Sequence, residues 1–217
     1  MKQIVYMAVC LSVIISMEFG CSSKPIKLQY EIEQYDEKIA EINKKACISG
    51  CLILEGDSNV ELINFQEYFA QPACNFAKRG STTEDLLKRV DKVKETLPSI
   101  IVVLVGGNDL LRSVPIEEIE KNYAELISYY KTITKKVYCV SNLPVIQKLY
   151  STNSEIITLN RILERVCAKQ LVTFVNIYPH LYKNGGLNPD LARDPVHLNK
   201  AGQDKLVGYL KKYIIYR

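Results

Sequence analysis

The sequence predicts a three-layer α/β/α sandwich built on a mostly parallel sheet of about five strands. Short apolar runs alternate with amphipathic segments along the chain, an order typical of parallel sheets with helices on both faces. The run from Ile100 to Val105 is apolar and largely β-branched without alternation, as expected for a strand buried on both faces. The chain has 217 residues, 47% of them hydrophobic, which favours one globular domain after a short N-terminal segment.

The first 21 residues are interpreted as an export signal. Lys2 precedes an apolar stretch of 14 residues from Ile4 to Met17, which is too short to span a bilayer comfortably. The junction before Cys21 resembles a bacterial lipoprotein signal, in which this cysteine becomes lipidated, although Glu18 departs from that pattern. We therefore expect an exported protein, held at the cell envelope or outer surface through Cys21. The alternatives are a secreted or periplasmic protein and an uncleaved anchor.

Residues 22–217 are expected to form the single domain, starting with a helix packed on it. Residues 28–45 carry apolar side chains at three- to four-residue spacing with charged residues between them, which predicts an amphipathic helix. The apolar run 51–54 predicts the first strand, and residues 60–69 are expected to be helical. A second, weaker strand is expected at 73–77.

Capping signals predict where two of the following helices begin. Ser81 and Glu84 have the S-x-x-E spacing of a capping box, which predicts a helix reaching about Thr96. Pro115 is expected to start a helix that runs to about Thr132. The remaining elements are expected as strands at 100–105, 137–140 and 171–177 and as helices at 154–169 and 200–213.

The cysteines do not predict a metal site or a complete disulfide framework. Five of the seven remain if Cys10 leaves with the signal and Cys21 carries lipid, and an odd number cannot pair fully. No spacing of Cys and His suggests zinc. Cys47 and Cys51 could pair, but their spacing leaves this open. The others lie in apolar patterns and are expected to be small buried hydrophobic residues: Cys74, Cys139 and Cys167.

The charge distribution argues against a nucleic-acid partner. The net charge of +4 is modest and survives removal of the signal, and no long run of Lys or Arg occurs. Membrane contact is expected only through a lipid anchor at Cys21. The sequence leaves the oligomeric state open.

Four loops are expected to meet at one edge of the sheet. Ser58, Gly80 and Asn108 each follow one of the first three predicted strands, and the segment 193–197 follows the last. In parallel α/β sheets, ligands bind beyond the carboxyl ends of the strands, where such loops collect. The sequence therefore predicts one site that contains all four segments.

These loops contain residue types that acyl transfer needs. Ser58 lies on a strand-to-helix turn and is either a nucleophile or only a helix cap. Of the two histidines, His197 has Asp194 three residues before it, so that carboxylate could orient the imidazole as a base. His180 has no acidic neighbour in sequence and is interpreted as a loop or surface histidine. Asp194 could instead cap the last helix, although Asn199 suits that role.

Two further residues could stabilise an oxyanion. The Gly80 N–H could point into the site without obstruction by a Cβ, and Asn108 offers a side-chain amide donor. The alternative is that both are ordinary turn residues.

Together these segments resemble SGNH (GDSL-like) hydrolases, and among them the platelet-activating-factor acetylhydrolase-type members, over residues 28–213. The resemblance implies a flavodoxin-like sandwich, a nucleophile at Ser58, a base at His197 with Asp194 as its partner, and no metal or cofactor. It also implies that the oxyanion hole consists of the Ser58 and Gly80 N–H groups and the Asn108 side chain. The motifs that carry it are 56–58, 75–83, 106–109 and 194–199, and the departures are Glu55, residues 76–79 and Pro195.

The expected function is hydrolysis of a carboxylic ester through an acyl-enzyme. Little room for a lid is expected between Asn108 and Asp194, so a shallow site for a short acyl group such as acetyl is predicted, on a small-molecule, lipid or glycan ester. One alternative is a surface-tethered binding lipoprotein without turnover, suggested by the divergent residues 76–79. Another is acyl transfer onto a cell-envelope glycan, which shares the acyl-enzyme.

Overall fold

A computed structural model of the protein describes residues 34, 37–39, 41–42, 47–146 and 153–214. The chain divides into residues 1–38 and 39–217, and the fold below is that of the second unit. The predicted export signal, the lipidation site Cys21 and most of the predicted helix at 28–45 lie outside the described residues. The described residues between 34 and 42 are helical. No helix in the described ranges is both long and apolar enough to cross a bilayer.

The main sheet has five parallel strands in the order β2-β1-β3-β4-β5, which confirms the predicted fold class. Strands β1 and β3 pair along their whole length, so their carboxyl ends open at the same edge. A separate two-stranded hairpin, β6 and β7, precedes the last helix. The strands are β1 (Leu52–Gly56), β2 (Ala73–Asn75), β3 (Ile100–Leu104), β4 (Val137–Val140), β5 (Thr173–Val175), β6 (Tyr182–Lys183) and β7 (Gly186–Leu187).

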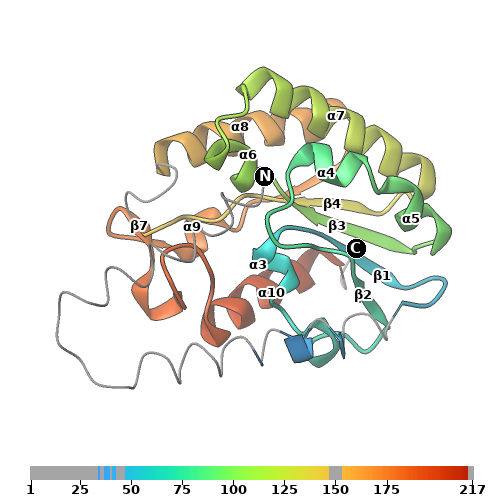
Figure 1. Cartoon of the computed structure of the whole chain (residues 1–217), viewed down its shortest axis with the longest axis horizontal. Helices are drawn as coiled ribbons and strands as arrows, with labels where there is room; N and C mark the ends of the chain where they lie inside the picture. The colour runs from blue at the N-terminus through green and yellow to red at the C-terminus, as the bar shows by residue number, and fades with distance from the viewer. Residues whose placement is uncertain (1–33, 35–36, 40, 43–46, 147–152, 215–217) are drawn as a thin grey trace, which may run out of the picture. The chain divides into compact units, whose positions relative to one another are not determined.

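Helices cover both faces of the sheet (Figure 1). One face packs against α4, α5, α7 and α8, and the other packs against α3, η1, α9 and α10. The α-helices are α3 (Ser58–Glu61), α4 (Thr83–Leu87), α5 (Val90–Glu95), α6 (Gly107–Leu111), α7 (Ile116–Ile133), α8 (Asn153–Lys169), α9 (Tyr178–Leu181) and α10 (Lys200–Ile214). Two 3-10 helices complete the described elements, η1 (Phe65–Glu67) and η2 (Pro189–Leu191).

The two hydrophobic cores explain why the central strands lack alternation in sequence. In β3, Ile101 and Val103 belong to the core under α7 and α8, whereas Val102 and Leu104 belong to the core under α10. All five residues of β3 are buried, so every position favours an apolar side chain. The parallel pairing of β1 with this strand brings the loops after both strands to the same edge of the sheet.

The predicted single helix at 60–69 is wrong, because this segment forms α3 and η1 with a break between them. The Val60 carbonyl accepts a hydrogen bond from Asn75 Nδ2 at 2.9 Å, and the Leu62 carbonyl accepts one from Gln203 Nε2 at 3.2 Å. Side chains from β2 and α10 therefore bind backbone carbonyls at the break, although the Val60 carbonyl also accepts from the Ile63 N–H at 3.1 Å. The sequence pattern could not reveal these distant partners.

The predicted helix from Ser81 to Thr96 is also divided, into α4 and α5. The capping box lies one residue later than predicted: Thr82 is the N-cap, and its partner is Asp85. The hydroxyl of Ser81 instead accepts a hydrogen bond from Arg89, at the junction between the two helices. This arrangement ties the α4–α5 junction to the loop before α4.

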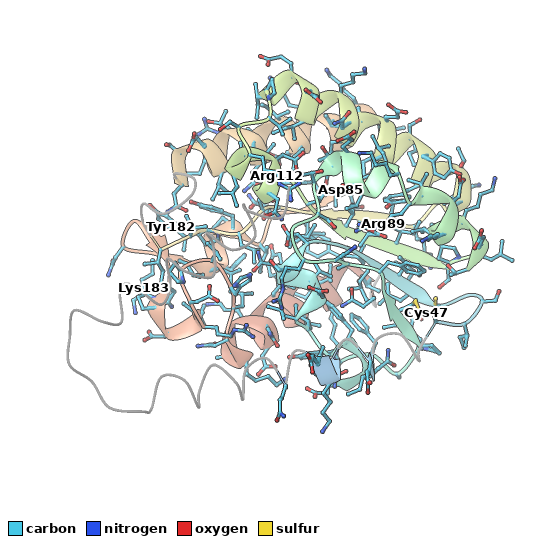
Figure 2. All side chains as sticks on the ribbon, viewed as in Figure 1. Cys47, Asp85, Arg89, Arg112, Tyr182 and Lys183 are labelled. Atoms are coloured by element: carbon cyan, nitrogen blue, oxygen red, sulfur yellow. A yellow bond between two sulfur atoms is a disulfide. The ribbon has the colours of Figure 1, made fainter. Side chains whose placement is uncertain are left out.

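The cysteine predictions are partly wrong. Cys47 pairs with Cys74 rather than with Cys51, and the bond is visible beside the Cys47 label in Figure 2. Cys74 is therefore buried as half of a disulfide and not as a free thiol. Cys139 and Cys167 are buried free cysteines, as predicted, and Cys51 is a third. The disulfide attaches the segment before β1 to the edge strand β2.

Candidate active site

A close backbone approach at the end of β1 aims Ser58 into the site. A Cβ on Gly56 would lie 2.3 Å from the Leu104 carbonyl oxygen, so only glycine fits where β1 passes β3. Asp57 then caps α3 by accepting a hydrogen bond from the Asn59 N–H at 2.9 Å. The interpretation of Ser58 as the helix cap is therefore wrong, because Asp57 has that role. Ser58 begins the helix with its hydroxyl available for another partner.

That partner is His197, 139 residues further along the chain. His197 Nε2 lies 2.9 Å from Ser58 Oγ, and His197 Nδ1 lies 2.7 Å from Asp194 Oδ2. The other carboxylate oxygen of Asp194 accepts hydrogen bonds from the backbone N–H groups of Val196 and His197, at 2.9 and 2.8 Å. Asp194 therefore closes a tight turn that fixes the imidazole, while Asn199 caps α10 by accepting from Gly202 N–H.

The electrostatics of Asp194 favour a permanently charged partner for the imidazole. Partial burial tends to raise the pKa of this carboxyl, but the hydrogen bonds from His197 and Val196 outweigh it and lower the pKa to about 2. A charged Asp194 accepts from an Nδ1–H, which leaves Nε2 as the lone-pair nitrogen facing Ser58. The arrangement can remove a proton from the hydroxyl.

Gly80 and Asn108 lie beside Ser58 in the same pocket. Gly80 has a φ of +74°, a left-handed conformation that glycine adopts without strain. Asn108 Nδ2 donates to the Ser81 carbonyl at 3.1 Å and has a longer contact of 3.4 Å with Asp57 Oδ2. The long contact is weak, so this amide proton can turn to a stronger acceptor in the pocket.

Residues in and directly after α6 contact α4 and the loop that contains Gly80. Asp109 is 1% exposed and accepts hydrogen bonds from the Thr83 N–H and from the Thr83 hydroxyl, the latter at 2.6 Å. Arg112 donates to the Gly80 carbonyl at 2.7 Å and pairs with Asp85 at 3.6 Å. Arg112 and Asp85 are labelled in Figure 2, where α6 approaches α4. Asp109 thus joins α6 to α4, and Arg112 joins the end of α6 to both α4 and the Gly80 loop.

Two buried carboxyl groups, Glu55 and Asp57, lie on either side of Gly56 just before Ser58. Burial raises the pKa of Asp57 to about 6, against hydrogen bonds from Asn59 and the positive charge that His197 can carry. Burial likewise raises the pKa of Glu55 to about 7, against the hydrogen bonds and charge of Arg89. The Glu55–Arg89 ion pair was not predicted from the sequence. Its only sequence signal was a charged residue directly after the apolar run of β1.

Four of the predicted site residues line a single pocket of about 240 Å³: Ser58, Gly80, Asn108 and His197. Asp194 lies behind His197, and Cys21 lies outside the described residues. The geometry expected for the four loops is therefore present. The apolar part of the pocket wall comes from Leu104, Leu111, Leu143, Val145, Ile156 and Val196.

The second histidine lies away from this pocket. His180 is exposed on α9, and its ring packs against Tyr209 with 4.3 Å between ring centroids. This agrees with its interpretation as a surface histidine. Within the described ranges, no three His, Cys, Asp or Glu side chains gather as metal ligands would.

Comparison with known proteins identifies similar sequences and folds. The sequence model of the GDSL-like lipase/acylhydrolase family matches residues 61–205, more than half of the chain. The match begins just after Ser58 and includes Gly80, Asn108, Asp194 and His197. Curated relatives include the N-acylneuraminate cytidylyltransferase of Streptococcus agalactiae, 24% identical over 162 residues. That alignment covers 75% of this chain but 38% of the relative, so the chain spans well under half the length of this relative.

Solved structures share the fold at low sequence identity. A GDSL-like lipase from Bacteroides thetaiotaomicron has a TM-score of 0.71 and 21% identity, covering 85% of this chain and 97% of that one. An acetylxylan esterase from Geobacillus stearothermophilus has a TM-score of 0.64 and 18% identity, covering 78% of this chain and 96% of that one. Both similarities extend over nearly the whole of the other protein.

Proposed function

Since the chain belongs to the GDSL-like lipase/acylhydrolase family, we propose that it is an ester-bond hydrolase, namely a serine esterase with Ser58 as its nucleophile. The observation that carries this proposal is the hydrogen-bond chain Ser58–His197–Asp194, with distances of 2.9 and 2.7 Å. A hydroxyl, an imidazole and a carboxylate in this order form the arrangement that activates serine nucleophiles on unrelated folds.

In the first step, Ser58 Oγ attacks the ester carbonyl carbon while His197 Nε2 takes the hydroxyl proton. The charged Asp194 stabilises the imidazolium that results, and its two backbone hydrogen bonds keep it in place. His197 then gives the proton to the leaving alkoxide, and an alcohol departs. The product is an acyl-enzyme on Ser58.

The oxyanion of the tetrahedral intermediate needs donors that are already in position. We assign this role to the N–H groups of Ser58 and Gly80 and to the Asn108 side chain. The Asn108 amide exchanges its long contact with Asp57 for the stronger bond to the oxyanion, which favours the transition state over the ground state. In the second step, His197 removes a proton from water, and the attack of this water releases the acid and restores Ser58.

The proposed substrate is a short-chain acyl ester, such as an acetyl ester on a glycan or lipid. The pocket of about 240 Å³ has an aliphatic wall suited to a small acyl group, and one structural neighbour is an acetylxylan esterase. Faster cleavage of a dodecanoyl ester than of an acetyl ester would refute this preference. Products measured with and without added glycan would separate hydrolysis from acyl transfer.

The proposed location is the cell envelope, through a lipid on Cys21. The Cys47–Cys74 disulfide supports export, because stable disulfides belong mainly to oxidising compartments outside the cytosol. The test is detergent-phase partitioning of the expressed full chain and of Cys21→Ser. Equal partitioning of the two proteins would contradict lipidation.

The central experiment compares variants in hydrolysis of p-nitrophenyl acetate. Ser58→Ala and His197→Ala are expected to lose nearly all turnover, and Asn108→Ala is expected to lose about 10²- to 10³-fold in kcat. The matched controls are Ser128→Ala, an exposed serine on α7, and His180→Ala, the other histidine. Full activity in Ser58→Ala would rule out the mechanism. A fluorophosphonate probe that labels the wild type and not Ser58→Ala would exclude a binding protein without turnover.

A further inference from the structure

A buried ion pair joins β1 to the α4–α5 junction. Glu55, in β1, has a side chain that is 0% exposed, and Arg89, at the α4–α5 junction, is 15% exposed. Arg89 Nη2 lies 2.8 Å from Glu55 Oε2, and Arg89 Nε lies 3.2 Å from each carboxylate oxygen. The contact is therefore bidentate, a geometry that a guanidinium makes and an ammonium does not.

The same guanidinium also binds the two loops that carry the proposed oxyanion donors. Nη2 of Arg89 donates to the Gly56 carbonyl at 3.2 Å, two residues before Ser58. Nη1 donates to the Ser81 hydroxyl at 2.9 Å, one residue after Gly80. Glu55 orients Arg89 so that one planar group reaches both loops. Arg89 is labelled in Figure 2, between α5 and the strands below it.

Ser81 extends this network to the third proposed donor. Its hydroxyl accepts from Arg89, and its carbonyl accepts from Asn108 Nδ2 at 3.1 Å. Ser81 is 3% exposed, so water does not compete for these contacts. The Ser58 loop, the Gly80 loop and the Asn108 side chain are thus connected through a single guanidinium and a single serine.

Stability alone is a poor explanation for this pair. Above a pH of about 7, where Glu55 is ionised, burying the two charges removes their hydration. Replacement of buried ion pairs by apolar side chains of similar size is often neutral or stabilising. What an apolar pair cannot provide is hydrogen bonding in three directions from one plane. The neighbouring strand positions Leu52, Ile53 and Leu54 are all apolar, so Glu55 interrupts the apolar run at the position that contacts Arg89.

We propose that Glu55 and Arg89 form a positioning pair that sets the separation of the Ser58 and Gly80 loops, so that their N–H groups act on one oxyanion. The proposal rests on the esterase function given above and assigns neither residue a direct contact with substrate. Displacement of reacting groups by about 1 Å lowers rates by up to about 10²-fold. Loss of the pair is therefore expected to reduce kcat by about 10- to 100-fold with KM nearly unchanged.

Two variants test the pair in different ways. Arg89→Lys keeps the positive charge beside Glu55 but loses the planar fork, so it separates charge from geometry. The double variant Glu55→Leu/Arg89→Met keeps an apolar, filled core and is expected to have a urea midpoint at or above that of the wild type. Both are expected to lose kcat on p-nitrophenyl acetate. The control is Lys88→Met, at the residue directly before Arg89. It removes an exposed ion pair with Glu84 and is expected to leave kcat unchanged.

The kinetic outcomes are compared only for variants whose cooperative urea unfolding shows that they are folded. A fall in kcat of more than about threefold in both variants, with KM within about twofold, supports the proposal. The proposal is overturned if kcat falls less in either variant, or if the loss of kcat/KM comes from a rise in KM. If the pair had a purely electrostatic or structural role, Arg89→Lys would instead keep a kcat close to that of the wild type.

Two further results keep the test decisive. If the double variant does not fold, Ser81→Ala replaces it, because this change removes a single hydrogen bond to Arg89. Wild-type kcat in Ser81→Ala would then overturn the proposal. Activity that persists in Ser58→Ala would refute the esterase mechanism and this inference together, whereas Ser58-dependent activity leaves the Glu55 and Arg89 variants to decide the inference alone.

Discussion

Replacement of Asp194 by Asn tests how the imidazole is held. In the wild type, one oxygen of Asp194 accepts from two backbone N–H groups, and the other accepts from His197 Nδ1 at 2.7 Å. In the Asp194→Asn variant, the single side-chain oxygen is needed for the backbone groups, so the NH2 group faces Nδ1. Two donors cannot share this contact, and the imidazole is expected to carry its proton on Nε2. That nitrogen then donates to Ser58 instead of accepting its proton.

The expected loss of kcat in Asp194→Asn depends on how deeply the Asp194–His197 pair is buried. In Ser-His-Asp triads with a buried carboxylate, this substitution lowers kcat on the order of 10⁴-fold, about 5.5 kcal/mol. Here the Asp194 side chain is 36% exposed, so solvent screens part of its charge. The tautomer effect remains in full. We therefore expect a fall in kcat of about 10³-fold, or about 4 kcal/mol.

The assay is steady-state hydrolysis of p-nitrophenyl acetate at neutral pH, well above the pKa of about 2 that the carboxyl of Asp194 has in the folded protein. The matched control is Asp190→Asn, which changes an exposed carboxylate that pairs with Lys183 at 3.2 Å. This control is expected to keep kcat within about twofold, because Asp190 does not line the pocket and an exposed ion pair contributes little to stability. A tenfold or smaller loss in Asp194→Asn would refute the tautomer argument.

Three further predictions concern stability, measured by urea unfolding. Gly56→Ala forces a Cβ to within 2.3 Å of a backbone oxygen and is expected to destabilise the fold by more than ~2 kcal/mol, whereas Gly208→Ala on α10 meets no atom within 4 Å and is expected to be neutral or stabilising. Cys47→Ser opens a disulfide between residues 27 positions apart and is expected to lower the free energy of unfolding by ~3 kcal/mol. Burial raises the pKa of Glu55 from 4.5 to about 7, so the folded state holds a proton that the unfolded state has released, and the free energy of unfolding falls as pH rises between these values. Glu55→Gln is expected to remove this part of the pH dependence.

Each of these predictions has a clear contrary result. Equal stability of the two glycine variants would mean that β1 and β3 move apart at low cost. An unchanged urea midpoint in Cys47→Ser would mean that the loop is already constrained when unfolded. The pH argument fails if Glu55→Gln keeps the wild-type slope between pH 5 and 7; Asp57 titrates in the same direction and retains part of it.

The sheet and its loops could be predicted because a strand that is buried on both faces is a continuous apolar run in the sequence. Strand β4 has the predicted bounds, and β1 and β3 differ from prediction by one or two residues. The strand predicted at 171–177 is shorter, because Leu171 is 93% exposed in a turn with a φ of +57°. An apolar residue in a turn and one at the start of a strand look alike in sequence.

Ser58, Gly80 and Asn108 could be proposed because each follows a strand in a parallel sheet. Asp194 and His197 could be proposed because a carboxylate three residues before a histidine can orient its imidazole. What the sequence could not reveal were contacts between distant segments that lack a periodic pattern. Glu55 and Arg89 are 34 residues apart, and the Cys47–Cys74 pairing depends on the segment before β1 lying beside the edge strand. The break between α4 and α5 could not be predicted either, because the hydrogen bond from Arg89 to Ser81 at this junction leaves no periodic pattern in the sequence.

The Cys47–Cys74 bond also decides how the protein responds to mechanical load. The backbone from Cys47 to Cys74 forms a closed covalent ring, and both β1 and Ser58 lie inside it. A force applied between the two chain ends crosses from one sulfur to the other, so the ring cannot be drawn out. Stretching the oxidised protein should therefore fall short of the full contour length by roughly 90 Å, a difference that reduction restores.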